Sequence, residues 1–207
     1  MPKLYYTPTS CGAASFIAAN IAGVSFEAEQ VDLRAHTTTS GADFYAVNAK
    51  GNVPTLVLED GTVLNEGAAV LQYIADQAPG TLAPRNGEVG RYLVQQSLNH
   101  TASEIHPAIG GLFNPAHNEH TRAFFNGLIE KRLTFLNQHV VRGAQYVVGD
   151  SLTIADLYLY IVLSWAPYVN VDLSVYPNVT AYFAFIKDNE KVKAGHARIA
   201  ETPGSTF

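Results

Sequence analysis

Hydrophobic positions along the first third of the chain change between the spacing of strands and the spacing of helices. The segment "KLYYT" (3–7) has the composition of a strand, and the alanine-rich run from Cys11 to Ala22, followed by Gly23, is typical of a helix with a glycine C-cap. In "FEAEQVDL" (26–33) apolar and polar residues alternate with one slip, as in a half-buried strand. This region therefore predicts a β-α-β unit.

A strand–strand–helix group is predicted to follow. The segment "VPTLVLEDGTVLNEG" (53–67) contains two apolar runs joined by Asp60-Gly61, the dipeptide that a type I′ hairpin turn prefers. We expect these two strands to be antiparallel. The next segment, "EGAAVLQYIADQA" (66–78), predicts a helix with the Glu66 carboxylate in its first turn, where it favours the helix dipole.

Prolines and glycines cluster in "APGTLAPRNGEVG" (78–90), and strand patterns end there. This change predicts a domain boundary. We expect a first domain at residues 1–80, a linker at 81–87 and an all-α second domain at 88–207.

Apolar stripes with helical spacing dominate the second domain. The segments 91–106 and 121–140 both have helical patterns, and one stripe in the latter consists of Phe125, Leu128, Ile129, Leu133, Leu136 and Val140. In "GDSLTIADLYLYIVLSWA" (149–166), Thr153 and Asp156 have the spacing of a capping box. The apolar run that follows predicts a buried helix, because it is shorter than the roughly 20 residues needed to cross a bilayer.

Composition narrows the classes of partner. The 207 residues are 47% hydrophobic, and the formal net charge is −5 with a pI near 5.7. The chain can therefore form a sizeable core, and it lacks the basic character that nucleic acid or an anionic membrane attracts. We expect a small or neutral partner, with no nucleic acid and no membrane.

Cysteine content and the start of the chain indicate the compartment. The single cysteine excludes an internal disulfide, and "MPKLYY" lacks the features of a secretory signal. These observations predict a cytoplasmic, reducing environment.

The single cysteine, Cys11, is predicted to lie where a strand gives way to a helix. A lone cysteine is often simply a small buried hydrophobic residue. At a helix N-terminus, however, unpaired backbone N–H groups stabilise a thiolate, which makes Cys11 a candidate nucleophile. A β-α-β-β-β-α order with cysteine at the start of the first helix is the layout of the thioredoxin-like fold. Because no second cysteine is present, the redox partner of Cys11 would be an external thiol.

Segment 53–67 also has features of a binding site for such a thiol. A cis Pro54 would leave the backbone N–H and C=O of Val53 unpaired, so an extended peptide could add to that edge. Glu66 and Gly67 offer backbone donors to a carboxylate at a helix start, and Glu66 can accept from an ammonium group. Glu66 by itself is a common helix-start acid, but its combination with Val53-Pro54 favours a pocket for a small acidic peptide thiol.

These motifs resemble the glutathione transferase family, most closely its bacterial-type beta class. The resemblance covers nearly the whole chain in order, through "KLYYTPTSCGAAS", "ADFYAVNAKGNVPTLVLEDGTVLNEGAAVLQYIAD", "SLNHTASEIH" and "GDSLTIADLYLYIVLSWA". The pattern from Asn48 to Asp76 is highly specific, whereas "TIAD" indicates only a transferase-like helical domain. The resemblance implies an α/β thioredoxin-like N-terminal domain followed by an all-helical domain.

The resemblance also implies roles in the first domain. Cys11 matches the class cysteine that contacts or covalently captures glutathione. Val53, before a cis Pro54, is expected to hold the cysteinyl backbone of glutathione, and Glu66 with Gly67 is expected to hold its γ-glutamyl end.

In the helical domain, the resemblance implies that several residues line the same site, some of them from the partner subunit of a homodimer: Asn99, Ser103, Glu104 and His106. His106 matches a residue near the glutathione sulfur, and Trp165 matches one at the wall of the hydrophobic-substrate pocket. Thr153 and Asp156 match the structural folding motif of the family.

Simpler interpretations of the helical-domain residues stay open. Asn99, Ser103 and His106 recur at intervals of four and three, which also fits a solvated helix face. A histidine before Pro107 fits a helix end, and Trp165 fits a core position. Pairing with the Cys11 thiol favours a role of His106 in the site, because a histidine that titrates near neutrality can stabilise a thiolate or relay the proton of a thiol.

The chain departs from the family pattern at several positions. His36 stands where relatives have a basic residue that reaches the glycyl end of glutathione, with Arg34 nearby. Gly12 replaces a hydroxyl residue after the cysteine, and Pro107 stands where lysine is frequent. The neighbouring hydroxyl groups of Ser10 and Tyr6 rank below Cys11 as reactive groups.

The sequence thus predicts a glutathione transferase that acts on small hydrophobic electrophiles, on disulfides through Cys11, or on both. Glutathione is expected as a substrate, and no metal is expected because the histidine pairs lack ligand partners at suitable spacing. The alternative is a non-enzymatic protein of the same fold that binds glutathione or a hydrophobic ligand.

Overall fold

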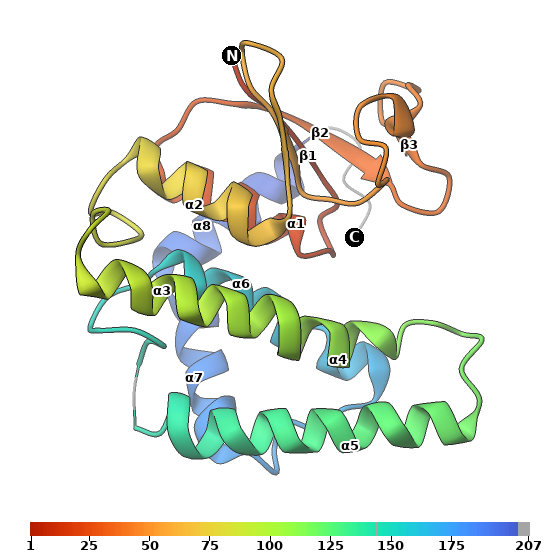
Figure 1. Ribbon diagram of the computed structural model, residues 1–207, viewed down its shortest axis with the longest axis vertical. Helices are drawn as coiled ribbons and strands as arrows, with labels where there is room; N and C mark the ends of the chain where they lie inside the picture. Colours follow the sequence, from red (N-terminus) through yellow and green to blue (C-terminus); the bar gives the residue numbers. More distant parts are fainter. Residues whose placement is uncertain (144, 203–207) are drawn as a thin grey trace. The chain divides into compact units, whose positions relative to one another are not determined.

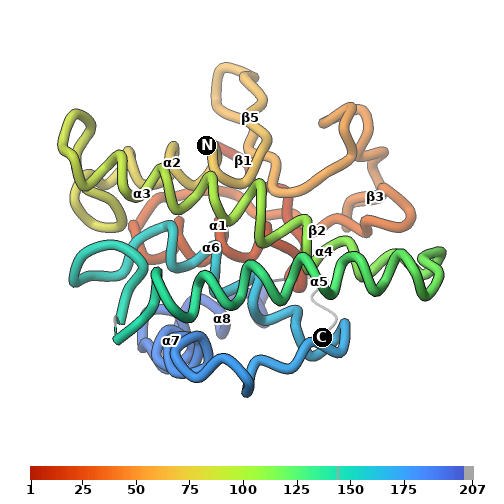
Figure 2. Tube along the Cα trace, turned by 60° about the horizontal axis from the view of Figure 1, so that its bottom comes forward, coloured from red at the N-terminus to blue at the C-terminus, as the bar shows by residue number. Residues whose placement is uncertain are grey.

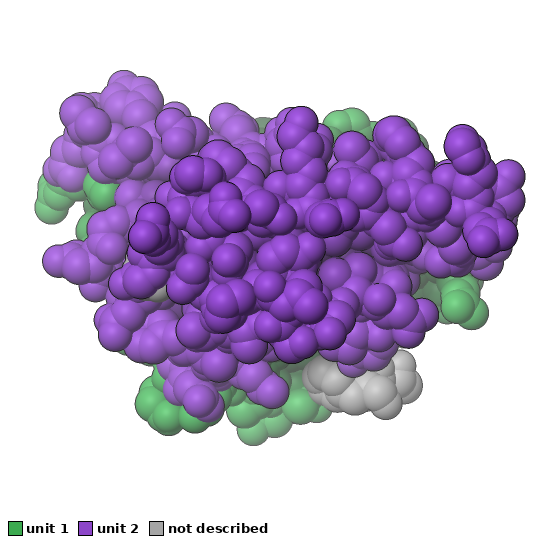
Figure 3. Space-filling model, turned by 90° about the horizontal axis from the view of Figure 1, so that it is seen from below, with its two compact units in different colours: residues 1–86, 190–207 green, residues 87–189 purple. Residues whose placement is uncertain are grey.

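The computed structural model describes residues 1–143 and 145–202, and contacts divide the chain into two compact units. One unit consists of Met1–Asn86 and the chain from Glu190 onward, and the other is Gly87–Asn189 (Figure 3). The division differs from the predicted domains 1–80 and 88–207 in assigning the last helix to the first unit. The domain limits themselves stay a prediction, and residues 203–207 of the predicted second domain lie outside the described residues.

The first unit is built on a mixed five-stranded sheet (Figure 1). Its strands are β1 (Lys3–Tyr6), β2 (Glu27–Asp32), β3 (Thr37–Thr38), β4 (Thr55–Val57) and β5 (Val63–Asn65), in the order β3-β2-β1-β4-β5. Strands β1 and β2 are parallel, and the other pairs are antiparallel. The predicted thioredoxin-like order is confirmed, although the two-residue strand β3 lies in a threonine-rich loop that gave no strand pattern.

The hairpin between β4 and β5 corrects the predicted turn. Gly61 has a φ of +83°, but Asp60 is not in the left-handed region, as a type I′ turn would require. The amide of Leu58 donates to the Thr62 carbonyl, and the Gly61 amide donates to Leu58. These bonds close a three-residue loop, residues 59–61, in which Gly61 takes the left-handed conformation. Three-residue loops of this kind are the next most common hairpin connection after two-residue loops.

Three α-helices complete the first unit: α1 (Gly12–Ala22), α2 (Gly67–Gln77) and α8 (Glu190–Glu201). Helix α1 is apolar and buried along its first two turns, and it ends at Gly23 in the left-handed conformation, as predicted. Helix α8 approaches α1 closely, because a Cβ atom on Gly195 would lie 2.9 Å from Ile17 Cγ2. Helix α8 therefore packs with the thioredoxin-like elements despite its distance in sequence.

The alternating side chains of β1 separate two apolar layers in this unit. Tyr6 stacks on Phe16 of α1 with 4.8 Å between ring centroids, whereas Tyr5 contacts Phe44 of the short helix η1 (Phe44–Ala46). Tyr6 is fully buried, in agreement with its low rank as a reactive group.

The second unit is helical throughout its described secondary structure (Figure 2). Its elements are α3 (Val89–His100), the π-turn η2 (Thr101–Ile105), α4 (His106–Gly111), α5 (Glu119–Phe135), the π-turn η3 (Leu136–Val140), α6 (Ile154–Leu163), the 3₁₀ turn η4 (Ala166–Val169) and α7 (Pro177–Asp188). Every residue of α6 is buried, which confirms the predicted buried helix. In the described residues, no helix is both long and apolar enough to cross a bilayer.

A π-turn modifies the long helix predicted at 91–106. The His106 amide donates to the Thr101 carbonyl, five residues back, where an α-helix would use a carbonyl four residues back. Pro107 has no backbone N–H group and cannot continue the hydrogen-bond ladder of an α-helix. This accounts for the local change in hydrogen-bond register directly before it. His106 is consequently the first residue of α4, and the chain stays helical through it.

Candidate functional site

Cys11 lies directly before α1, at the position that the sequence predicts. Its thiol donates a hydrogen bond to the Val53 carbonyl, with 3.3 Å between sulfur and oxygen. The Val53-Pro54 peptide bond is cis, as predicted. The thiol and the strand edge are therefore adjacent, but the Val53 carbonyl is paired with the thiol, which corrects the expectation that it would be free.

The turn before α1 leaves little room after the cysteine. The Gly12 amide donates to Ser10 Oγ over 3.1 Å, so Ser10 satisfies a backbone N–H group at the helix start. A Cβ atom on Gly12 would lie only 3.0 Å from Tyr6 Cβ and 3.2 Å from Ser10 Oγ. Glycine at this position is thus explained by close packing between the helix start and β1.

The protonation of Cys11 differs from the sequence-based expectation. Burial raises the pKa of the Cys11 thiol to about 12; the N–H groups of Cys11 and Gly12 lower it, and the Glu66 charge raises it further. Part of the residue still reaches the surface. Desolvation of the thiol therefore favours its protonated form more strongly than the backbone N–H groups at the helix start favour the thiolate.

Helix α2 begins at Gly67, as expected for a helix start here, but Glu66 is its N-cap residue and does not lie in the first turn, which corrects the prediction. Glu66 has a φ of +72°, which is uncommon for a residue with a side chain, and its carbonyl accepts the amides of Ala69 and Val70. Its carboxylate pairs with Lys50 Nζ at 2.7 Å, on a surface where the two side chains are 63% and 55% exposed. Glu66 is thus an accessible acid that pairs with the flexible side chain of Lys50.

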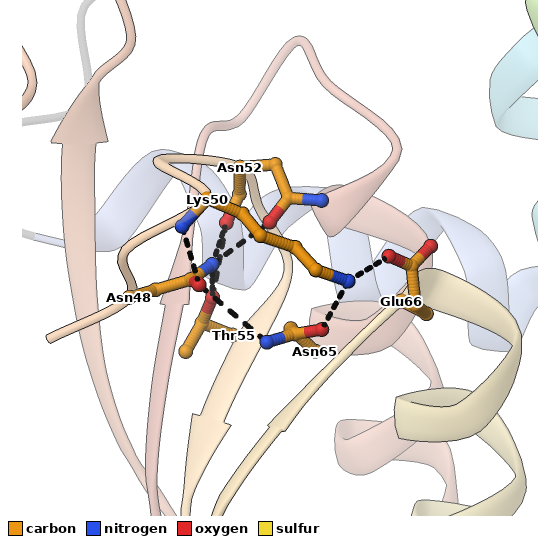
Figure 4. A network of polar contacts seen from close by, with 6 residues as sticks. All are labelled: Asn48, Lys50, Asn52, Thr55, Asn65 and Glu66. Carbon is orange, nitrogen blue, oxygen red and sulfur yellow. Dashed lines mark hydrogen bonds and ion pairs between the residues drawn. The ribbon is translucent and has the colours of Figure 1, made fainter. Parts of the chain in front are cut away.

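A buried asparagine holds the loop that carries Lys50 (Figure 4). Asn48 is 4% exposed, and its Nδ2 lies 2.9 Å from Thr55 Oγ1, 2.9 Å from the Asn52 carbonyl and 2.8 Å from Asn52 Oδ1. Its Oδ1 accepts from the Lys50 amide and from Asn65 Nδ2. This network fixes residues 48–52 against β4 and β5, beside the cis proline.

His36 lies in the same unit and contacts that loop. Its ring stacks on Tyr45 with 4.4 Å between centroids, and its Nδ1 is buried without a hydrogen-bond partner in the described residues. A Cβ atom on Gly51 would lie 2.9 Å from His36 Nδ1, so only glycine fits this approach. The ring is therefore packed on one side, and its predicted contact with a glycyl carboxylate stays a prediction.

The helical unit places the other predicted residues on α3, η2 and α4. Asn99 and Ser103 are exposed, and the Ser103 hydroxyl donates to the Asn99 carbonyl over 2.9 Å. Glu104 forms an ion pair with Arg132 of α5. Both members of this pair line a cavity of about 720 Å³ within the unit, together with apolar residues such as Phe135.

His106 is held by an aromatic cluster within the helical unit. Its Nδ1 lies 2.8 Å from the Tyr158 hydroxyl, and its ring meets Trp165 edge-on at 4.8 Å. Burial lowers the pKa of His106, so the imidazole is neutral at pH 7. Trp165 is 7% exposed and also contacts Phe113, which fits a core position; its predicted role in a substrate pocket stays a prediction.

Thr153 and Asp156 form the predicted capping box at the start of α6. The Asp156 carboxyl group accepts from the amide and hydroxyl of Thr153, from the Val147 amide and from the Tyr182 hydroxyl. No cluster of three or more potential metal-ligating side chains occurs in the part of the chain that the structure describes.

Comparison with known proteins decides the family. The glutathione S-transferase N-terminal domain family matches residues 11–77, and the C-terminal domain family matches residues 104–195. Glutathione S-transferase GstA of Escherichia coli O157:H7 is 36% identical over 193 residues, which cover 92% of this chain and 95% of that protein. The chain belongs to the glutathione S-transferase family.

Solved glutathione S-transferases agree in fold over nearly the whole chain. A sphingomonad enzyme complexed with glutathione is 37% identical with a TM-score of 0.89, and the beta class enzyme of Sphingomonas chungbukensis is 35% identical with a TM-score of 0.88. Each match covers 95% of this chain and 98% of the other. The predicted glutathione transferase family is thereby confirmed, and the solved relatives include an enzyme of the predicted beta class.

Sequence reasoning missed three side chains that shape the site regions. Lys50 and Asn48 lie inside the family-like motif, but no local pattern shows that they pair with Glu66 and Thr55, 16 and 7 residues away. Tyr158 was part of an apolar helix pattern, and its bond to His106 spans 52 residues. The only available signal was the presence of polar side chains in otherwise apolar or turn-forming segments.

Proposed function

We propose that this glutathione S-transferase conjugates glutathione to small hydrophobic electrophiles and that Cys11 lines the glutathione site with its thiol protonated. The observation that carries this proposal is the hydrogen bond from the Cys11 thiol to the Val53 carbonyl. A thiol engaged as a donor, with a pKa raised by burial, is a poor nucleophile. The attacking group is then the sulfur of glutathione.

The proposed reaction uses the first unit to bind glutathione. The backbone of Val53 holds the cysteinyl part, while Glu66 and Gly67 hold the γ-glutamyl end, as the resemblance implies. The glutathione thiol loses its proton to solvent, and the resulting thiolate attacks an electrophilic carbon and forms a C–S bond. In a substitution the electron pair of the broken bond leaves with the departing group, and in an addition the electron pair of the broken π bond takes up a proton. The role of His106 near the glutathione sulfur is part of this proposal, as are those of His36, Asn99, Ser103, Glu104 and Trp165.

The assembly and cellular setting are also proposals. We expect a homodimer, because the family resemblance implies that some of the residues lining the glutathione site belong to the partner subunit. A cytoplasmic location fits the single free cysteine, which needs a reducing environment to stay a thiol. Detoxification of electrophiles is the physiological role that fits this chemistry.

Steady-state kinetics of the purified protein and of Cys11→Ala test the proposal. We expect the variant to retain conjugation of glutathione to an aryl halide within about threefold, because it removes no attacking group. Loss of conjugation in Cys11→Ala, with glutathione binding intact, would contradict the proposal, because it would show that Cys11 takes part in the reaction. Absence of turnover in the unmodified protein, despite tight glutathione binding, would support the non-enzymatic alternative.

A further inference from the structure

The pair formed by Lys50 and Glu66 presents two opposite charges at the start of α2. Lys50 Nζ lies 2.7 Å from Glu66 Oε1 and 3.1 Å from Asn65 Oδ1 (Figure 4). Both side chains are more than half exposed. An exposed pair of this kind stabilises the fold by only about 0–1 kcal/mol, so a ligand can separate it easily.

The position of Lys50 is determined by the buried part of the same network. Asn48 binds the Lys50 amide through Oδ1, and the same oxygen accepts from Asn65 Nδ2. Asn65 in turn accepts from Lys50 Nζ. The ammonium group of Lys50 is therefore brought to Glu66 by a packed loop, although its side chain is flexible.

We propose that Lys50 and Glu66 together recognise the zwitterionic amino-acid end of the γ-glutamyl group. Glu66 binds the α-ammonium group, and Lys50 moves from Glu66 to the α-carboxylate. This inference rests on the proposed binding of the γ-glutamyl end at Glu66 and Gly67, and it adds a specificity-determining residue to that site.

Charge and side-chain chemistry support this assignment of Lys50. Gly67 has no side chain, so it offers the α-carboxylate only its backbone N–H. Lys50 is the one side-chain cation bonded to Glu66 and Asn65 within the described residues. A ligand that carries an ammonium and a carboxylate on one carbon replaces one internal ion pair with two charge-assisted contacts.

Calorimetric titration of Lys50→Met with glutathione and with two analogues tests this inference. One analogue lacks the α-carboxylate and the other lacks the α-amino group. We expect Lys50→Met to bind glutathione about 10-fold more weakly than the unmodified protein, because it loses one charge-assisted contact. The same substitution should leave affinity for the analogue without the α-carboxylate unchanged, and it should still weaken binding of the analogue without the α-amino group.

Lys193→Met is a matched control, because Lys193 forms another exposed pair, with Glu190, at 3.2 Å in the same unit. It should bind glutathione normally, and both variants should keep the unfolding midpoint of the unmodified protein. Unchanged or tighter glutathione binding by Lys50→Met would overturn the inference, as would equal weakening for glutathione and the analogue without the carboxylate. If the unmodified protein binds no glutathione, the proposed function fails as well, so the two failures are distinguishable.

Discussion

Glu66 and Asp156 are both acidic residues at helix starts, but their surroundings differ completely. Asp156 is 0% exposed and accepts from Thr153, Val147 and Tyr182, all within the helical unit. Glu66 is 63% exposed, and among the described residues its carboxylate pairs with one flexible side chain, that of Lys50. The carboxylate oxygens of Asp156 are occupied by hydrogen bonds within the fold, whereas those of Glu66 can still accept hydrogen bonds from a ligand.

This difference shows how to separate structural from functional acids that look alike in sequence. Both residues favour a helix dipole, and both belong to motifs that resemble the family pattern. Burial with complete hydrogen bonding indicates a role in stability, while exposure next to a cis proline and a thiol indicates a role in binding. The following experiments test the contrast, from the largest expected effect to the smallest.

Replacement of Asp156 by alanine should have the largest effect on stability. It leaves the buried donors of Thr153 and Tyr182 without their acceptor, which should lower the free energy of unfolding by about 3–5 kcal/mol. Urea denaturation measures this loss. Asp150→Ala, at an exposed position nearby, serves as the control, and equal effects of both substitutions would show that the buried network contributes little.

Replacement of Glu66 by glutamine should change binding and leave stability nearly intact. Loss of the charge-assisted contact to the ligand ammonium should weaken glutathione binding by about 10- to 100-fold, with a stability change within about 0.5 kcal/mol. Calorimetry and thermal unfolding measure the two quantities. Glu59→Gln, which alters another exposed acid of the same unit, should change neither; unaltered binding by Glu66→Gln would remove Glu66 from the site.

Glu29 extends the comparison to a buried acid in the first unit. Burial raises its pKa, but hydrogen bonds from Lys3, Ser40 and Thr38 lower it more, to about 2. Since the folded pKa is below the unfolded value, the ion pair contributes stability above about pH 4.5, and that stability is lost as the pH falls toward 2.

In Glu29→Gln, the free energy of unfolding should therefore decrease less as the pH falls into the acid range. Between pH 5 and pH 2 the unmodified protein should lose about 1–2 kcal/mol more than the variant, with the partial exposure of Lys3 limiting the effect. Urea titrations at several pH values measure the difference. Parallel acid limbs for the two proteins would contradict the lowered pKa of Glu29.

The smallest effect is expected for the neutral pair of His106 and Tyr158. Tyr158→Phe removes a hydrogen bond to Nδ1 and should lower the free energy of unfolding by about 1 kcal/mol. It should also change the ¹⁵N chemical shifts of the His106 ring, because Nδ1 loses the hydrogen bond that helps to fix the tautomer of the imidazole. Tyr160→Phe on the same helix should leave the His106 signals in place; unaltered signals in Tyr158→Phe would show that Tyr158 does not orient His106.

Much of the fold follows from short-range patterns in the sequence. The Gly23 cap, the capping box at Thr153 and the apolar run of α6 all act within a few residues, and each appears as predicted. The turn at Asp60 and the π-turn before Pro107 differ from expectation, because alternative hydrogen-bond registers fit the same local sequence.

The candidate site was less predictable, because its chemistry depends on contacts between distant residues. Motif matching indicated Cys11, Val53 and Glu66, and the structure brings Cys11 to Val53. The raised pKa of Cys11 could not be inferred, since it reflects burial in the folded chain rather than the nearby helix start. The pairing of Lys50 with Glu66 likewise requires the loop geometry that Asn48 provides.

The central claim is that Cys11 keeps its proton and leaves the attack to glutathione, and the pH dependence of Cys11 alkylation tests it most directly. Iodoacetamide can add only one group to a thiol in this chain, so intact mass spectrometry follows the reaction without ambiguity. With a pKa of about 12, the alkylation rate should rise about tenfold per pH unit from pH 7 to pH 10. A fast rate that is constant above pH 7 would contradict the claim and would identify Cys11 as a reactive thiolate.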